Sequence, residues 1–267
     1  MDWGPGYREQ QPPAGLLPSV ACLWARVVGP GASAVAAVLP DACVDLIWER
    51  GRGLFVAGPD TGPAPSVSPP GTVLAALRFV PGAAGPALGL PMSELLNQRV
   101  DAADLDTGPA TELARALPGT LAPAQALAAL TRMAGALTAG GPADPLAAHA
   151  ARLLRHPGAR AEGIAGRLGV SERQLRRRCQ AAVGYGPATL RRVLRFRRFV
   201  AWADAGAPGG DLATVAAELG YADQAHLTRE CARLAGLTPA ALLAARRPRV
   251  GAGQAERGGG NNAAARR

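Results

Sequence analysis

Two short segments of the chain carry side chains that can recognise bases in double-stranded DNA. One begins at Ser171 and is crowded with arginine, and the other begins at Asp223 and mixes amide, imidazole, hydroxyl and guanidinium groups. A guanidinium can donate two hydrogen bonds to guanine, an amide can pair with adenine, and a threonine methyl group suits thymine. The residues expected to contact bases are Arg173, Gln174, Arg176, Arg177, Gln224, His226, Thr228 and Arg229.

Other polar side chains in the same region suit the DNA backbone better than the bases. Phosphate contacts position a protein on the duplex without reading its sequence. The residues expected to make them are Gln180, Arg195, Arg198 and Arg233. Three side chains have a second interpretation: Gln174 and Asp223 could act only as helix caps, and His226 could meet phosphate or water. For Asp223 we favour the cap.

Both segments must lie on helices that follow tight turns. In the first, a short apolar helix face ends at Leu168, and Gly169 supplies the left-handed residue of a turn. Ser171 and Gln174 have the spacing of a capping box, which starts a new helix expected over 171–183. A short helix, a glycine turn and a second helix with a basic polar face form a helix-turn-helix unit.

The same pattern recurs 51 residues further on, counted from Gly169 to Gly220. A capped apolar helix precedes Gly220, and Asp223 opens a second polar-faced helix expected over 223–235. The segment 187–204 between the units predicts one long helix that holds them at a fixed separation. We therefore expect an all-α C-terminal domain with two helix-turn-helix units joined by a long helix.

Six motifs span this basic region from end to end. They are Ile164-Ala165, Leu168-Gly169-Val170-Ser171, Gln174 to Arg177, Gly186-Pro187, the run from Ala216 to Arg229, and Gly236-Leu237-Thr238-Pro239. In this combination residues 145–248 resemble the DNA-binding domain of the AraC/XylS family of transcription regulators. The resemblance implies that two recognition helices enter successive major grooves on one face of the DNA. The family more often has phenylalanine where this chain has Cys179 and Cys231, which are small changes in the core.

The N-terminal half is predicted to be rich in β-strands. Short apolar segments bounded by proline and glycine turns lie at 20–28, 35–39, 43–48, 54–56 and 72–80. They predict a small sandwich or barrel, with Trp24 and Trp48 in its core or, less favoured, in a binding pocket. The motifs Leu39 to Trp48, Val56 to Thr61, Arg78 to Gly82 and Leu88 to Leu95 resemble an uncharacterised β-rich domain that precedes such modules in actinobacterial regulators. That resemblance names no ligand.

These elements predict an α+β chain of two domains. We expect an irregular arm over 1–19, a loop over 82–90, and a short helix over 91–98. A β-rich sensor or interaction domain spans 20–140 and ends in a helix near 121–137. The DNA-binding domain covers 144–248, and a tail over 250–267, rich in glycine, alanine and asparagine, is expected to be disordered.

Charge divides between the two halves of the chain. Residues 1–150 hold 8 arginines and 12 acids, a net charge of −4, whereas residues 151–267 hold 21 arginines and 8 acids, a net charge of +13. A strongly basic domain suits a polyanion, either nucleic acid or an anionic membrane surface. A membrane surface gives the two glycine-turn units no purpose, so we expect double-stranded DNA. A small-molecule effector, a second copy of the chain and RNA polymerase are further candidate partners.

Four cysteines stand at positions 22, 43, 179 and 231, without a C-x-x-C pair or metal-type spacing to histidine. We therefore expect no metal, no cofactor and no catalytic residue. An alternative of another class is an enzyme, a cysteine alkyl-transfer repair domain using Cys22 or Cys43 and fused to the DNA-binding module. Asp41 and Asp45 flank Cys43 and disfavour its thiolate, so we expect them to be buried polar anchors.

The sequence carries no sign of export or membrane insertion. The first ten residues include acids, glycine and proline, and no apolar run follows them as in a signal peptide. An apolar stretch of about 18 residues, the length a membrane helix needs, is also missing. The expected location is therefore the cytoplasm.

Overall fold

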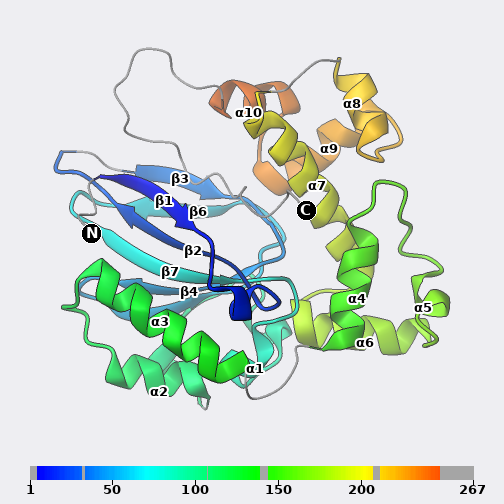
Figure 1. The fold of residues 1–267 in the computed structure, drawn as a ribbon. Helices are drawn as coiled ribbons and strands as arrows, with labels where there is room; N and C mark the ends of the chain where they lie inside the picture. Colours follow the sequence, from blue (N-terminus) through cyan, green and yellow to red (C-terminus); the bar gives the residue numbers. More distant parts are fainter. Residues whose placement is uncertain (1–4, 32–33, 107, 139–143, 207–210, 247–267) are drawn as a thin grey trace.

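The computed structural model describes residues 5–31, 34–106, 108–138, 144–206 and 211–246 (Figure 1). Within these ranges the chain forms a β-rich N-terminal domain followed by a helical C-terminal domain, which confirms the predicted α+β class with two domains. The break expected at 140–142 and the tail at 250–267 lie outside the described residues.

An antiparallel sheet of six strands is the frame of the N-terminal domain. In spatial order it consists of β1 (Gly6–Gln10), β2 (Val20–Val27), β7 (Val73–Phe79), β4 (Val44–Glu49), β5 (Gly53–Ala57) and β8 (Arg99–Asp101). A separate two-stranded ribbon pairs β3 (Ala34–Val38) with β6 (Ala64–Ser68). Because successive side chains of a strand point to opposite faces, the six-stranded sheet presents two faces of different character.

One face of the sheet packs against helices and forms the larger N-terminal core. The helices are α1 (Gly85–Leu88), α2 (Pro109–Ala116) and α3 (Pro123–Thr138), which lie together beneath the sheet in Figure 1. Leu46, Trp48 and Leu77 of the sheet are fully buried in this core together with Leu130 of α3. The indole Nε1 of Trp48 donates to the Pro118 carbonyl at 3.2 Å, so burial leaves its polar atom satisfied.

The opposite face carries three cross-strand rows of side chains, because antiparallel partners stand side by side on one face. The first row contains Tyr7, Arg26, Leu74 and Glu49. The middle row contains Glu9, Trp24, Ala76, Ile47 and Phe55. The third row contains Cys22, Arg78, Asp45, Ala57 and Arg99. The middle row is largely apolar, and charged side chains stand in the rows on both sides of it.

Seven helices of the described chain make up the C-terminal domain. They are α4 (Pro145–Leu154), α5 (Ile164–Arg167), α6 (Glu172–Val183), α7 (Pro187–Asp204), α8 (Leu212–Glu218), α9 (Gln224–Ala235) and α10 (Pro239–Arg246). Helix α7 runs through the middle of the domain, and its Leu190, Val193 and Phe196 are fully buried. Helices α4, α6, α9 and α10 pack against it, as expected for a long connecting helix.

Caps and turns define the two helix-turn-helix units. Ser171 and Gln174 form the predicted capping box, and the Asp223 carboxylate accepts from the His226 backbone N–H at 2.6 Å. Gly220 has a φ of +81°, and a Cβ there would lie 2.2 Å from the Pro157 carbonyl oxygen. Only glycine combines this conformation with such a close approach, so Gly220 also holds the second turn against the chain after α4.

The two domains meet at an apolar interface. Ala42 of the N-terminal domain is buried in the C-terminal core, and Leu39 and Leu96 pack against the same core. The domains approach closely at Gly184, just after α6, where a Cβ would lie 2.5 Å from Cγ of Pro59. The end of α6 is therefore seated directly on the N-terminal domain.

Several expectations for the N-terminal half were wrong. Residues 6–10 form strand β1 instead of an irregular arm, residues 85–88 form α1 inside an expected loop, and residues 92–95 form only a 3-10 turn. Strands β6 and β8 and helix α2 were not predicted. Strand β1 is largely polar and owes its structure to backbone pairing with β2, which leaves little trace in its own sequence.

Candidate nucleic-acid interface

Helix α6 separates a buried side from a polar exposed side. Its apolar residues Leu175, Cys179 and Val183 are buried against the domain core. The five predicted DNA contacts on this helix are all exposed: Arg173, Gln174, Arg176, Arg177 and Gln180. Among the described residues, no salt bridge is recorded for Arg173, Arg176 or Arg177. The helix thus presents three unpaired guanidinium groups to solvent.

Helix α9 has the same construction with different polar groups. Leu227, Cys231 and Leu234 are buried, whereas Gln224, Arg229 and Arg233 are exposed. Thr228 is half-buried, and its hydroxyl donates to the Gln224 carbonyl at 2.9 Å. The Thr228 methyl group remains available to a thymine, while its hydroxyl is already used within the helix.

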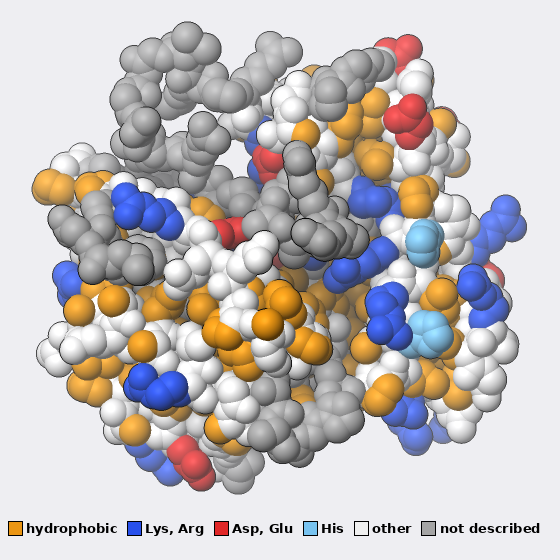
Figure 2. Space-filling view, in the orientation of Figure 1, with side chains coloured by type: hydrophobic (Ala, Val, Ile, Leu, Met, Phe, Trp, Pro, Cys, Tyr) orange, Lys and Arg blue, Asp and Glu red, His pale blue; other side chains and the backbone are white. Residues whose placement is uncertain are grey.

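The basic surface belongs mainly to the helical domain. Figure 2 shows arginine side chains spread over the C-terminal domain on the right of the view, with histidine between them. This distribution agrees with the net charge of +13 that the sequence places in residues 151–267. A duplex that approaches this domain meets a field of opposite charge.

Residues 164–245, which include both units and α7, match a family model described as a helix-turn-helix domain. The C-terminal domain is an AraC-type helix-turn-helix domain. The chain that carries it is a DNA-binding transcription regulator. The predicted resemblance of residues 145–248 is thereby confirmed.

The N-terminal domain matches a family of a different kind. Residues 8–101, from β1 to β8, match a domain of unknown function (DUF6597). No curated protein sequence matches the chain. Two crystal structures of ToxT from Vibrio cholerae are similar to it over 83% of this chain and 95% and 97% of ToxT, at 9% identity and TM-scores of 0.42 and 0.44.

The side chain of Gln174 takes part in the cap that begins α6. Its Oε1 accepts from the Ser171 backbone N–H at 2.9 Å and from the Ser171 hydroxyl at 3.1 Å. Because the oxygen is occupied by the cap, only the amide N–H₂ is free to meet DNA. A bidentate contact to adenine needs both atoms, so we expect Gln174 to act as a donor only.

His226 is turned partly inward. Its Nδ1 lies 3.3 Å from the Ala222 backbone N–H, its Nε2 lies 3.2 Å from an Arg195 nitrogen, and its ring meets Tyr221 edge-on at 5.4 Å. Burial, followed by the charge of Arg195, lowers the pKa of His226. A neutral imidazole with both nitrogens facing the protein supports the second turn more directly than it contacts a base.

Two of the arginines predicted to contact phosphate form hydrogen bonds within the protein instead. Arg195 is only 5% exposed, donates to the Gly220 carbonyl at 3.0 Å and stacks over the Tyr221 ring at 4.3 Å. Arg198 donates to the Leu219 carbonyl at 3.0 Å and to the Arg155 carbonyl. Since these guanidinium groups fasten the second unit to α7, we exclude both from the proposed DNA surface.

Glu230 is a residue of the second unit that sequence reasoning missed. It lies on the buried side of α9 with 7% exposure and forms ion pairs with Arg192 at 3.1 Å and Arg195 at 3.7 Å. The angles at Glu230 Oε2 are not those of a hydrogen bond, so the contact is mainly electrostatic. A signal existed in the sequence: Glu230 falls between the inward-facing Leu227 and Leu234.

A second ion pair fastens α6 to the start of α4. The Arg178 guanidinium donates to the Asp144 carboxylate at 2.7 and 2.8 Å, and the same carboxylate caps α4. Burial alone raises the pKa of Asp144, but the bonds from Arg178 and from the Ala147 N–H outweigh it, and the pKa is lowered. Arg178 thus holds α6 against the start of α4.

The cysteines considered for alkyl transfer lie in unreactive surroundings. Cys22 and Cys43 are both buried, and burial raises the pKa of each thiol, to about 12 for Cys22. A nucleophilic thiolate needs the opposite shift.

None of the described helices has the length and apolarity of a membrane-spanning segment.

Proposed function

We propose that α6 and α9 recognise two short blocks of DNA sequence in successive stretches of the major groove on one face of the duplex. The observation that carries this proposal is the repeated unit: two helices with exposed arginine or amide faces, both packed on α7. A rigid connecting helix holds two recognition helices at a fixed spacing, as one-sided reading of a duplex requires.

Base contacts are assigned to the exposed side chains. On α6 they are Arg173, Arg176 and Arg177, with Gln174 as a donor, and on α9 they are Gln224, Thr228 and Arg229. Gln180 and Arg233, also exposed, are assigned to phosphate. His226 keeps a supporting role at the turn. Each good bidentate arginine–guanine pair is worth about 1–3 kcal/mol of discrimination against the wrong base.

The N-terminal domain is the part that senses a signal or pairs two copies of the chain. Its direct packing on the end of α6 at Gly184 supports this role, because a change in the N-terminal domain then reaches a recognition helix without an intervening linker. A second copy and RNA polymerase are its proposed protein partners. Sedimentation of the chain with and without a target duplex tests pairing first.

The test of the function is selection of bound duplexes from a random library with the full chain and with the Arg176→Ala and Arg229→Ala variants. Two conserved blocks about one helical turn apart are expected. Each variant should relax one block and leave the other intact. Arg132→Ala, an exposed arginine on α3, is the matched control and should leave both blocks unchanged.

The proposal fails if binding depends on salt but no motif emerges, because the basic domain then acts only as a polyanion patch. It fails in part if both variants relax the same block. In that case a single helix reads the DNA, and the other has a structural role.

A further inference from the structure

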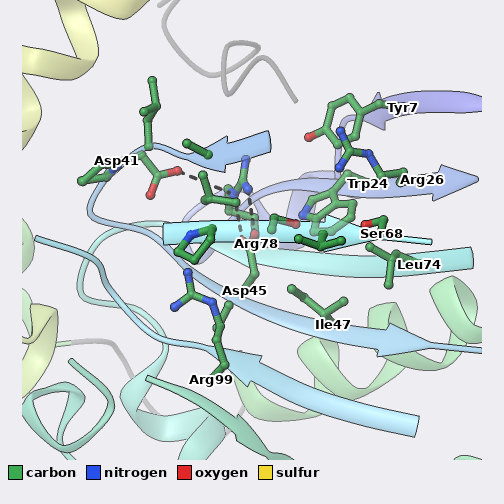
Figure 3. A pocket seen from close by; sticks show the side chains of 18 of the residues that line it. Tyr7, Trp24, Arg26, Asp41, Asp45, Ile47, Ser68, Leu74, Arg78 and Arg99 are labelled. Atoms are coloured by element: carbon green, nitrogen blue, oxygen red, sulfur yellow. Dashed lines mark hydrogen bonds and ion pairs between the residues drawn. The ribbon is translucent and has the colours of Figure 1, made fainter. Parts of the chain in front are cut away.

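A cavity of about 290 Å³ lies on the side of the six-stranded sheet that the helices leave free. Its walls are the three cross-strand rows of the sheet, the β3–β6 ribbon, and the side chains of Arg197, Val200 and Arg246 from the DNA-binding domain. Figure 3 shows Tyr7, Trp24, Arg26 and other side chains of these strands gathered around it. A molecule held there touches both domains.

The middle of the cavity floor is apolar and aromatic. Trp24, Ile47 and Phe55 stand in the middle row, and the ring of Tyr7 lies 5.7 Å from that of Trp24. Such a surface suits the planar or aliphatic body of a small molecule. The volume, at the low end for ligand sites, limits that body to a small one.

Most charges around the cavity are already paired within the protein. Arg78 binds the Asp45 carboxylate with two hydrogen bonds at 2.8 and 2.7 Å, and Arg99 binds Asp60 at 2.6 Å. Asp41 lies 3.8 Å from Arg78 as well. The acids at the α7 end of the floor are therefore engaged with arginine, which argues against a cationic ligand.

Arg26 differs from these arginines. It is half-buried in the first row, and among the residues that the structure describes no hydrogen bond or ion pair is recorded for it. Its neighbours across the strands are Tyr7 and Leu74, neither of which carries a charge at neutral pH. The acid of the same row, Glu49, lies beyond Leu74 and faces Arg52 at 3.7 Å.

A second hydrogen-bond donor in the cavity, the indole N–H of Trp24, also lacks a well-formed hydrogen bond. Trp24 is 7% exposed, and its Nε1 has no hydrogen-bond partner of normal geometry among the described residues. The indole of Trp24 lies near the Asp45 carboxylate but forms no hydrogen bond of normal geometry with it. Burial raises the pKa of Asp45, and the charge of Arg78 and the indole of Trp24 oppose that rise. A half-buried cation without a counter-charge and a buried N–H without a well-formed hydrogen bond are both unfavourable.

We propose that this cavity binds a small organic anion with an apolar or aromatic body, the anionic group paired with Arg26 and the body lying over Trp24, Ile47 and Phe55. An acceptor atom on the body satisfies the Trp24 N–H. The far end of the ligand contacts α7 at Val200 and Arg197. A bound ligand therefore touches the helix that joins the two helix-turn-helix units. This inference names the class of ligand for the proposed sensing role. Binding of the anion does not depend on that role, whereas an effect of the anion on DNA binding does.

The test is calorimetric titration of the full chain, without DNA, with 3-(4-methoxyphenyl)propionate, whose ether oxygen is an acceptor on the body, and with its neutral amide. The carboxylate is expected to bind, and the amide to bind at least tenfold more weakly. Arg26→Gln should reduce carboxylate affinity by about tenfold or more and leave amide affinity unchanged. Arg8→Gln is the matched control: it removes the same charge from an exposed position on the neighbouring strand, outside the cavity lining, and should change neither affinity.

Trp24→Phe provides an independent variant, because it keeps an aromatic ring in the middle row and removes the N–H together with the five-membered ring that carries it. It should weaken the carboxylate and the amide alike. Equal binding of the two probes, equal binding by Arg26→Gln and Arg8→Gln, or no heat from either probe at millimolar concentration overturns the proposal. Because no DNA is present, these outcomes stand apart from the outcome of the duplex selection. Adding the carboxylate to that selection then shows whether occupancy alters DNA binding.

Discussion

Replacing Glu230 by glutamine tests how α9 is held in place. Glu230 is a buried acid of α9, and it faces Arg192 at 3.1 Å and the buried Arg195 at 3.7 Å. The substitution keeps the size of the side chain and removes its charge. Arg195 is then left in a buried position without a counter-charge.

The size of the effect follows from the burial of the partners. Removing one member of a buried ion pair costs about 3–5 kcal/mol when the other charge stays uncompensated. Here the amide keeps an acceptor, Arg192 is 35% exposed, and Arg195 still donates to the Gly220 carbonyl. We therefore expect a loss of about 2 kcal/mol in the free energy of unfolding of the C-terminal domain.

Urea unfolding, followed by the loss of helical circular dichroism, measures this loss. Glu218→Gln is the matched control, because Glu218 is exposed on the adjacent α8 and carries the same charge. Glu230→Gln should also weaken recognition of the DNA block read by α9 and leave the block read by α6 intact. This second measurement separates a local displacement of α9 from general loss of structure.

The reasoning is refuted if Glu230→Gln and Glu218→Gln unfold at the same urea concentration. A double variant sharpens the test. Replacing Glu230 by glutamine together with Arg195 by methionine removes both charges, and apolar replacement of a buried ion pair is often neutral or stabilising. The double variant should therefore recover much of the lost stability, and a further loss instead would show that Arg195 acts through packing on Tyr221.

Three further outcomes are expected. Gly184→Ala should lower the free energy of unfolding, measured in urea, by about 2 kcal/mol or more, because the φ of Gly184 is +93° and a Cβ there meets Pro59. Gly169→Ala, which has open space at a φ of +68°, should lower it by only about 1 kcal/mol. Equal losses would show that the contact between the domains is not involved. Burial and the charge of Arg195 lower the pKa of His226, so the folded state binds fewer protons than the unfolded state. The contribution of His226 to the free energy of unfolding is complete above the unfolded pKa of about 6.5 and should be lost as the pH falls below it. A His226→Gln variant that keeps the full wild-type pH dependence of stability contradicts this. Cys22 and Cys43 should react with a thiol reagent at pH 8 only after unfolding, as measured by the rate of colour release, since burial raises both pKa values.

The helix-turn-helix units were predictable because their signals are local. A cap such as Ser171, a turn residue such as Gly220 and an apolar stripe such as Leu227 to Leu234 act within a few residues of chain, so their spacing is visible in the sequence. The exposed face of α6 follows from the same spacing. These predictions needed no knowledge of what packs against the helix.

Tertiary contacts redistributed the arginines in a way that spacing could not foresee. Arg195 and Arg198 occupy α7 among other arginines, yet they cap the ends of other helices, while Arg173 and Arg176 face solvent. All are the same residue type on helices of similar composition. What distinguishes them is the position of backbone carbonyls such as that of Gly220, which lies 25 residues from Arg195 in sequence.

By itself, the sequence determined the class of the C-terminal domain, its two repeated units, and which faces of α6 and α9 are polar, because helix caps, turns and amphipathic periodicity depend on neighbouring residues. The tertiary structure alone decided that β1 joins the sheet, that Glu230 of α9 faces Arg192 and Arg195 of α7, and that Arg26 stands unpaired among the described residues in a cavity bordered by both domains. Those features depend on pairings between distant segments, where burial and the presence or absence of a partner charge are set by the fold and not by the adjacent residues.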